Sequence, residues 1–370
     1  MTMYCTSPWT GLFLNTDGEV KSCCSGTWHW GNLKSQSLDA ILANPSVEKL
    51  KADILSGIEN SYCNNCRYSE TVSSSSQRDY YNQVTVDNPD IKNYQLQILD
   101  MRWSKLCNLT CTYCSEYFSS SWQEAKGLNL SPVKLSYHDQ LLKYIDDSSS
   151  NIKNVIIAGG EPLLQKQNIQ MLKSLSNNVH INIITNLSIN LANSPVFEVI
   201  KDRDNVSWDI SFENCGAQYE YVRHRANWQQ FQDNLELLKS LGRHMTFFGV
   251  FCVYSAPELL KYYQLAEKYQ ADIHWQTLID VDYLNIFKFS KPVRDHVIDQ
   301  IDLVFKLGVI KHPQAQTFLQ QARQQLADAS NTSEIDQLFR KWTVHHENNH
   351  MTTDLKFAEL WPRLNTFIKA

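Results

Sequence analysis

Six apolar runs of strand length follow one another from about Gln95 onward, with longer stretches between them. The runs cover residues 95–103, 153–158, 180–185, 205–212, 245–253 and 272–279. The stretches between them show helical periodicity, for example at 163–176, 227–241 and 256–270. Strands that alternate with helices in this way form a parallel sheet, so the pattern predicts an α/β fold whose sheet curls into an open barrel.

The sequence on either side of this pattern has a different character. We expect an N-terminal domain at 1–72, a linker at 73–94, the barrel at 95–285 and a helical C-terminal segment at 286–370. Within the N-terminal domain, the Asp-Gly pair at Thr16–Gly18 predicts a hairpin. Apolar spacing from Ser37 to Ile54 predicts helix.

Charge and composition favour a cytoplasmic enzyme. The 370 residues carry a formal net charge of −5, which gives no overall attraction to nucleic acid or to an anionic membrane. No run approaches the roughly 20 apolar residues of a membrane helix. The N-terminus lacks the charged and apolar regions of a signal peptide. We therefore expect a cytoplasmic protein without a nucleic-acid or membrane partner.

Cysteines give the first indication of chemistry. A reducing compartment disfavours disulfides, so clustered cysteines are better explained as metal ligands, and seven of the ten are candidate ligands in two groups. One group, Cys107, Cys111 and Cys114, follows the first apolar run directly. A zinc site would need a fourth ligand, and the nearest candidate, Glu116, is poorly placed. The spacing favours an iron–sulfur cluster with one open iron over zinc.

With Tyr113 directly before its last cysteine, this loop resembles the signature of the radical S-adenosylmethionine (SAM) superfamily. The resemblance implies a partial (β/α)6 barrel and a 4Fe–4S cluster on Cys107, Cys111 and Cys114. SAM would bind the fourth iron through its amino and carboxylate groups. One electron, from a flavodoxin- or ferredoxin-like donor, would then cleave SAM to methionine and a 5′-deoxyadenosyl radical.

A second motif lies at the end of the run 153–158. Gly159-Gly160-Glu161-Pro162 matches the GGEP motif of the same superfamily. Alone, these residues would indicate a turn after a strand. Paired glycines let a backbone approach a ligand closely. After the cysteine loop, they predict a site for the amino group of SAM.

Three other residues are candidate SAM contacts. Alternation along 205–212 places Ser211 on the same polar face as Asp209 and Glu213, and such a face is costly unless it lines a wet site. By resemblance, Ser211 and Arg223 lie near the SAM carboxylate. Asn186 belongs to a segment that resembles the superfamily's Thr-Asn-Gly, but Leu187 stands in place of the glycine.

The N-terminal cysteines form the second group. Cys5, Gly18 and Cys23 are spaced as Cys-x12-Gly-x4-Cys, and Cys63 and Cys66 follow as a CxxC pair. This pattern resembles the auxiliary-cluster domains called SPASM and, in shorter form, twitch. The resemblance implies that these four cysteines hold a second 4Fe–4S cluster.

Two alternatives stay open for this group. Cys24 competes with Cys23 as the third ligand, although the spacing from Gly18 favours Cys23. A zinc ribbon would use the same four thiolates. In the family these domains usually follow the barrel, whereas here the pattern precedes it.

The expected function is radical SAM chemistry, with a peptide as the first choice of substrate and a maturase-type modification as the reaction. The alternatives are a dehydrogenase or epimerase for a sugar- or nucleotide-like molecule, and a non-catalytic metal-binding interaction protein. No catalytic side chain is predicted; Cys215 and Cys252 are weak candidates for a hydrogen donor, because buried cysteines are mostly inert.

Overall fold

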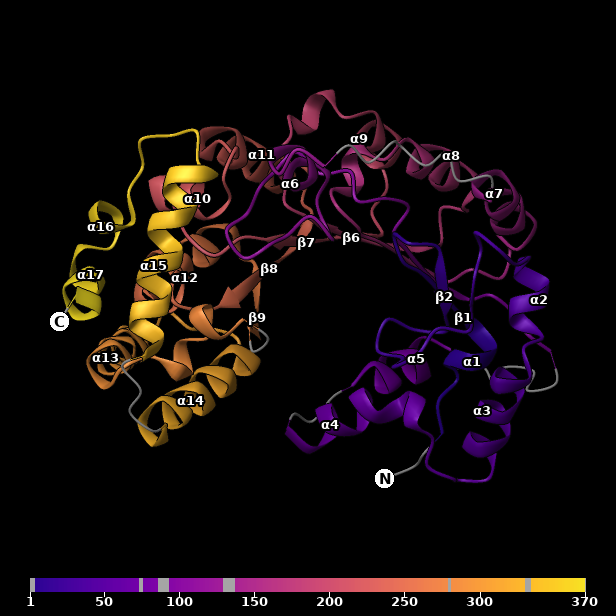
Figure 1. Cartoon of the computed structure of the whole chain (residues 1–370). Coiled ribbons are helices and arrows are strands. Elements are labelled where there is room, and N and C mark those ends of the chain that lie inside the picture. Colours follow the sequence, from indigo (N-terminus) through magenta and orange to yellow (C-terminus); the bar gives the residue numbers. More distant parts are fainter. Residues whose placement is uncertain are drawn as a thin grey trace. The chain divides into compact units, whose positions relative to one another are not determined.

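The computed structural model describes residues 4–72, 76–85, 93–128, 137–278, 281–329 and 334–369 (Figure 1). The chain divides into two compact units. The first comprises Met1–Cys107, Asn129–Ile184 and Ala192–Ser207, and the second comprises Asn108–Leu128, Thr185–Leu191 and Trp208–Ala370. Within the described segments, no helix combines the length and the apolar character that crossing a membrane requires.

The strands of the first unit are ordered β3-β2-β1-β4-β5-β6. They are β1 (Gly11–Leu14), β2 (Glu19–Lys21), β3 (Gly31–Asn32), β4 (Ile98–Met101), β5 (Asn154–Ile157) and β6 (His180–Thr185). The hairpin β1–β2 is antiparallel as predicted. Strand β1 also pairs in parallel with β4, with Gly11 opposite Ile98. The N-terminal region therefore extends the same sheet as β4, β5 and β6, which pair in parallel.

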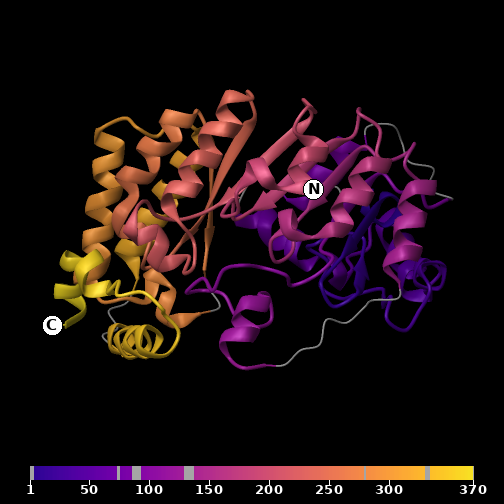
Figure 2. The ribbon, with the colours of Figure 1, turned by 90° about the horizontal axis from the view of Figure 1, so that it is seen from above.

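The helices of the first unit begin at recognisable caps. They are α1 (Ser7–Thr10), α2 (Leu38–Leu42), α3 (Pro45–Leu55), α4 (Asn64–Val72), α5 (Gln77–Val84), α7 (His138–Asp147), α8 (Lys166–Ser174) and α9 (Pro195–Ile200). The side chains of Ser37, Asn44 and Ser194 accept backbone N–H groups at the starts of α2, α3 and α9. Helices α7, α8 and α9 lie side by side along one face of β4–β6 (Figure 1), and Figure 2 shows them from above.

The second unit holds most of β7 (Val206–Ser211) together with β8 (His244–Phe251) and β9 (Asp272–Thr277), of which β8 and β9 pair in parallel. Its helices up to β9 are α6 (Ser120–Ala125), α10 (Ala217–Val222), α11 (Trp228–Ser240) and α12 (Leu259–Tyr269). The helices that follow β9 are α13 (Lys291–Lys306), α14 (Pro313–Asp328), α15 (Glu334–Asn349), α16 (Phe357–Leu360) and α17 (Pro362–Lys369). All six predicted strands and the helical C-terminal segment are confirmed.

Candidate functional site

Four of the N-terminal cysteines line one hollow in the first unit. Cys5 lies before α1, Cys23 follows β2, Cys63 ends a 3-10 turn and Cys66 lies in α4. Burial raises the pKa of the Cys5 thiol to about 11, and the nearby thiols of Cys63 and Cys66 raise it further. Burial, and then Cys5, raise the pKa of Cys23 as well. Thiols from three separate segments therefore line the same hollow.

Cys24 points elsewhere. It is absent from the residues that line the hollow, and its electrostatic neighbours are Asp100 on β4 and Arg102. Burial raises the pKa of the Cys24 thiol to about 11, and Asp100 adds to this shift. The geometry thus groups Cys23, and not Cys24, with the other cysteines.

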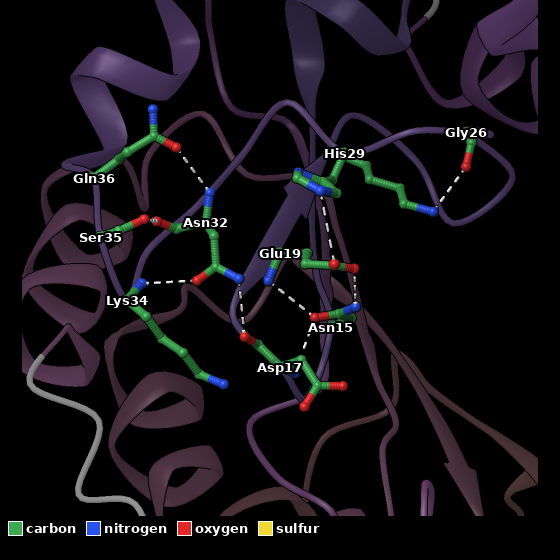
Figure 3. Close-up of polar contacts among 10 residues, drawn as sticks. Asn15, Asp17, Glu19, Gly26, His29, Asn32, Lys34, Ser35 and Gln36 are labelled. Atoms are coloured by element: carbon green, nitrogen blue, oxygen red, sulfur yellow. Dashed lines mark hydrogen bonds and ion pairs between the residues drawn. The ribbon is translucent and has the colours of Figure 1, made fainter.

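The hairpin that carries Cys23 is fixed by asparagine side chains (Figure 3). Asn15 Oδ1 accepts the backbone N–H groups of Asp17 and Glu19, both at 2.9 Å. Gly18 has a φ of +84°, which favours glycine in this turn. Asn32 Nδ2 donates to the Asp17 carbonyl at 3.2 Å. The Asp-Gly turn and the segment around Asn32 are therefore hydrogen-bonded to each other, so the two segments stabilise one another.

The second cysteine loop is divided by the unit boundary, since Cys107 ends a segment of the first unit while Cys111 and Cys114 belong to the second. In the second unit, the N–H of Thr112 donates to the carbonyl of the last residue of α10 at 2.8 Å. Trp122 Nε1 on α6 donates to the Cys111 carbonyl at 3.0 Å. Cys111 is buried, whereas Cys107 and Cys114 are partly exposed. Hydrogen bonds to its backbone groups therefore hold the middle of the loop.

A buried ion pair supports the same loop. The Arg223 guanidinium donates to both carboxylate oxygens of Glu213, at 2.8 and 3.0 Å. The hydroxyl of Tyr113, between the last two cysteines, donates to Glu213 Oε2 at 3.0 Å. Burial alone would lower the pKa of Arg223, but Glu213 raises it well above the ordinary value. Ser211, the last residue of β7, is half-buried and precedes Glu213 by two residues.

This network gives Glu213 a role that the sequence left open. The bidentate geometry fixes both groups, and removing either one would leave an uncompensated buried charge. It connects the end of β7 to the residue after α10 and, through Tyr113, to the cysteine loop.

Asn186 reaches the loop through a neighbouring side chain. Its Oδ1 accepts the N–H and the hydroxyl of Ser188, at 2.9 and 2.7 Å. Ser188 Oγ in turn accepts Asn108 Nδ2 at 2.8 Å. Between them, the buried Leu187 has a φ of +51°. Leu187, which stands where the superfamily has glycine, is therefore left-handed, and it holds this conformation at a cost of about 1–2 kcal/mol.

The GGEP segment lies against the chain that leaves β4 in the first unit. The N–H groups of Gly160 and Glu161 donate to the carbonyls of Ser104 and Leu106, at 3.1 and 2.7 Å. A Cβ on Gly160 would stand 2.4 Å from the Leu106 oxygen, so only glycine fits. Gly159 has a φ of +125°.

Glu161 and Pro162 start a 3-10 turn, Pro162–Leu164. The Glu161 carboxylate is fully buried and accepts the Leu163 N–H at 3.0 Å. The glutamate of the motif therefore caps this turn and stabilises the backbone conformation of the motif itself.

Family models match both regions of the chain. Residues 101–265 match the radical SAM superfamily, and residues 5–67 match the SPASM iron–sulfur cluster-binding domain. The chain carries a radical SAM domain preceded by a SPASM domain. The predicted family and the partial (β/α)6 barrel are thereby confirmed, together with 4Fe–4S clusters and SAM as the cofactors that these domains imply.

Among curated proteins, 7-carboxy-7-deazaguanine synthase of Clostridium acetobutylicum is 32% identical over 112 residues, which are 30% of this chain and 46% of that protein. The match thus spans about half of the curated relative. Among solved structures, anSMEcpe with bound AdoMet gives a TM-score of 0.40 at 15% identity, covering 57% of this chain and 62% of that one. Streptococcus suis SuiB bound to the precursor peptide SuiA gives 0.43 at 13%, covering 82% and 70%.

The side chains around both sites fit clusters of the radical SAM and SPASM kinds. Beside the loop of the radical SAM domain, buried side-chain oxygens of Asn108, Thr110 and Thr112 have no hydrogen-bond partner among the described residues. In the same described segments, no three Cys, His, Asp or Glu side chains converge as ligands of a single metal ion. The four SPASM cysteines instead line the wall of a hollow, where the irons of one cluster can each meet a thiolate.

One element of the site was missed by the sequence analysis. Helix α5 lies within the predicted linker and borders the cysteine hollow. A signal for it was present, because Ser76 and Asp79 have the spacing of a capping box and the Ser76 N–H does donate to Asp79 Oδ2 at 2.8 Å.

A zinc-protease pattern, His346-Glu347-Asn-Asn-His350, also occurs at the end of α15. Its glutamate is engaged structurally: Glu347 Oε1 accepts the Tyr221 hydroxyl at 3.0 Å and the Phe357 N–H at 2.7 Å. Burial lowers the pKa of His346 to about 3, and its ring stacks on Trp342 at 4.8 Å. These contacts assign the pattern to packing of the C-terminal helices.

Proposed function

We propose that this chain is a radical SAM enzyme that cleaves SAM reductively at a 4Fe–4S cluster held by Cys107, Cys111 and Cys114. The 5′-deoxyadenosyl radical that this chemistry supplies would abstract a hydrogen atom from a peptide, in a maturase-type modification. The observation that carries the proposal is the presence of both domains in one chain. Enzymes that this chain resembles in having an auxiliary domain often modify peptides.

The chain's own residues have separate tasks in this proposal. Gly159, Gly160, Glu161 and Pro162 would place backbone carbonyls near the amino group of SAM. Asn186, Ser211 and Arg223 would also contact SAM. The ion pair with Glu213 keeps Arg223 protonated and fixes the direction of its guanidinium group. Cys5, Cys23, Cys63 and Cys66 would hold the second cluster, and a flavodoxin- or ferredoxin-like protein would supply the electron.

A small-molecule reaction is the second candidate. The curated relative is named for a small molecule, 7-carboxy-7-deazaguanine, and its match covers 112 residues of this chain. Under this alternative, the enzyme would be a dehydrogenase or epimerase for a sugar- or nucleotide-like substrate, with the same SAM chemistry.

The first test uses the full chain, purified without oxygen and reduced with dithionite. About eight irons per chain are expected for two 4Fe–4S clusters. Addition of SAM should yield methionine and 5′-deoxyadenosine, measured by liquid chromatography. Eight irons without any 5′-deoxyadenosine would contradict the enzymatic proposal and favour a metal-binding interaction protein.

The second test separates the substrate classes. A short peptide encoded beside the gene should increase 5′-deoxyadenosine formation and change in mass. A scrambled peptide of equal composition is the control. If only sugar- or nucleotide-like compounds increase turnover, the small-molecule reaction replaces the peptide.

A further inference from the structure

Helix α5 lies outside both family-model matches, yet it is hydrogen-bonded to the residues on both sides of Cys5 and to the residue before Cys23. Asn82 Oδ1 accepts the Thr6 N–H at 2.9 Å, and Asn82 Nδ2 donates to the Tyr4 carbonyl at 3.0 Å. These bonds bracket Cys5. The buried Tyr81 hydroxyl donates to the Ser22 carbonyl, next to Cys23, at 2.9 Å. One helix therefore holds two of the cysteine-bearing segments.

The first turn of α5 faces the other two cysteines. Gln77 and Arg78 line the same hollow as Cys63 and Cys66. The backbone N–H groups of Arg78 and Gln77 interact with the Cys66 sulfur. The N-terminal end of a helix carries a partial positive charge, which favours anionic groups such as thiolates.

Arg78 adds a full positive charge at this place. Its side chain is only 5% exposed, and its Nε lies 3.1 Å from Glu70 Oε1 on α4. Arg78 lines the same hollow as Cys63 and Cys66, so its guanidinium can favour negative charge in that hollow. Glu70 is the carboxylate that partly balances it.

We propose that α5 completes the auxiliary-cluster site, and that Arg78 is a positioning residue whose buried charge raises the reduction potential of that cluster. The inference rests on the proposed binding of a cluster by Cys5, Cys23, Cys63 and Cys66. In a one-electron reduction no bond is made or broken, and the added electron makes the cluster more negative. A fixed cation beside it favours the reduced form, and removal of Glu70 strengthens that effect.

The potential is measured on the full chain with Cys107, Cys111 and Cys114 all changed to alanine, so that only the auxiliary cluster remains. Dithionite is the reductant in an anaerobic titration followed by electron paramagnetic resonance. Arg78→Gln should lower the midpoint potential by a shift equivalent to at least a tenfold change in the reduction equilibrium, about 59 mV. Glu70→Gln should raise it, and Arg78→Lys should stay close to the parent.

Arg340→Gln, which removes an exposed arginine from α15, is the matched control and should leave the potential unchanged. About four irons per chain are expected in this background. Without them, the proposed auxiliary cluster itself fails. With them, unchanged potentials in Arg78→Gln and Glu70→Gln, or shifts of the same sign in both, overturn the role of Arg78. If Arg78→Gln does not fold, the upward shift in Glu70→Gln still decides.

A second measurement tests the role of α5 as a whole. Asn82→Ala removes both bonds that bracket Cys5, so iron should pass to a chelator several-fold faster than in the parent. Gln83→Ala changes the exposed neighbour on the same helix and should release iron at the parental rate. Equal release rates in the two variants would show that α5 does not complete the site.

Discussion

The two cysteine groups of this chain are built in opposite ways. The SPASM cysteines come from three segments between Cys5 and Cys66, and three of the four are buried. Cys107, Cys111 and Cys114 lie within eight residues, and two of them are partly exposed. A site that is assembled from distant segments is closed by its fold. A site that is confined to one loop stays open on one side, which is where a substrate or cofactor can bind.

The largest expected effect is on SAM cleavage, which we assign to only one of the two cysteine groups. Cys107→Ala removes a ligand of the open site and should reduce 5′-deoxyadenosine formation to background. Cys63→Ala removes a ligand of the closed site and should leave part of the SAM cleavage intact, because that cluster is not where SAM binds. Product analysis under identical reduction gives both values. Equal losses in the two variants would remove the functional distinction between the groups.

The second prediction concerns the long-range support of the open loop. Glu213→Ala leaves Arg223 buried without its partner, which should lower the free energy of unfolding by about 3–5 kcal/mol. Glu236→Ala breaks the ion pair with Lys268, whose side chains are 50% and 52% exposed, and should cost at most about 1 kcal/mol. Urea denaturation of the full chain measures both. Similar losses of unfolding free energy in the two variants would mean that the buried pair does not stabilise the loop.

Gly160→Ala tests the contact between the GGEP segment and the chain after β4. The new Cβ would meet the Leu106 carbonyl, so the variant should lose about 1–3 kcal/mol of stability and bind SAM more weakly. Gly242→Ala has open space around its Cβ but a φ of +64°, so it should lose about 1 kcal/mol and retain its SAM affinity. Unchanged SAM binding in Gly160→Ala would argue against this segment as a SAM contact.

The smallest effect is expected at the left-handed position beside Asn186. Leu187→Gly and Leu191→Gly each remove a buried leucine side chain, but only Leu187 has a positive φ that glycine would relieve. Leu187→Gly should therefore cost about 1–2 kcal/mol less in unfolding free energy than Leu191→Gly. Equal costs would mean that the backbone at Leu187 is not strained.

The strands and the open loop could be predicted because their signals are local. Apolar runs and the spacing from Cys107 to Cys114 lie within a few residues of one another. The preference for Cys23 over Cys24 also followed from spacing, and Cys23 is the one of the two that lines the hollow.

The remaining features depend on contacts that sequence spacing does not encode. Helix α5 is mostly polar, and its place depends on bonds from Asn82 and Tyr81 to chain about 60–80 residues away. The pairing of Glu213 with Arg223 crosses a turn and a helix. The parallel pairing of β1 with β4 joins segments that the sequence divides by a linker.

This strand pairing bears on how the protein can be dissected. With β1 present, the outer backbone groups of β4 are hydrogen-bonded from Ile98 to Met101. Truncation before Gln95 would leave a row of bare amides and carbonyls beside apolar side chains, and such an edge recruits strands from other molecules. The barrel expressed alone should therefore precipitate, so the auxiliary region is also a solubility element that cannot be trimmed away.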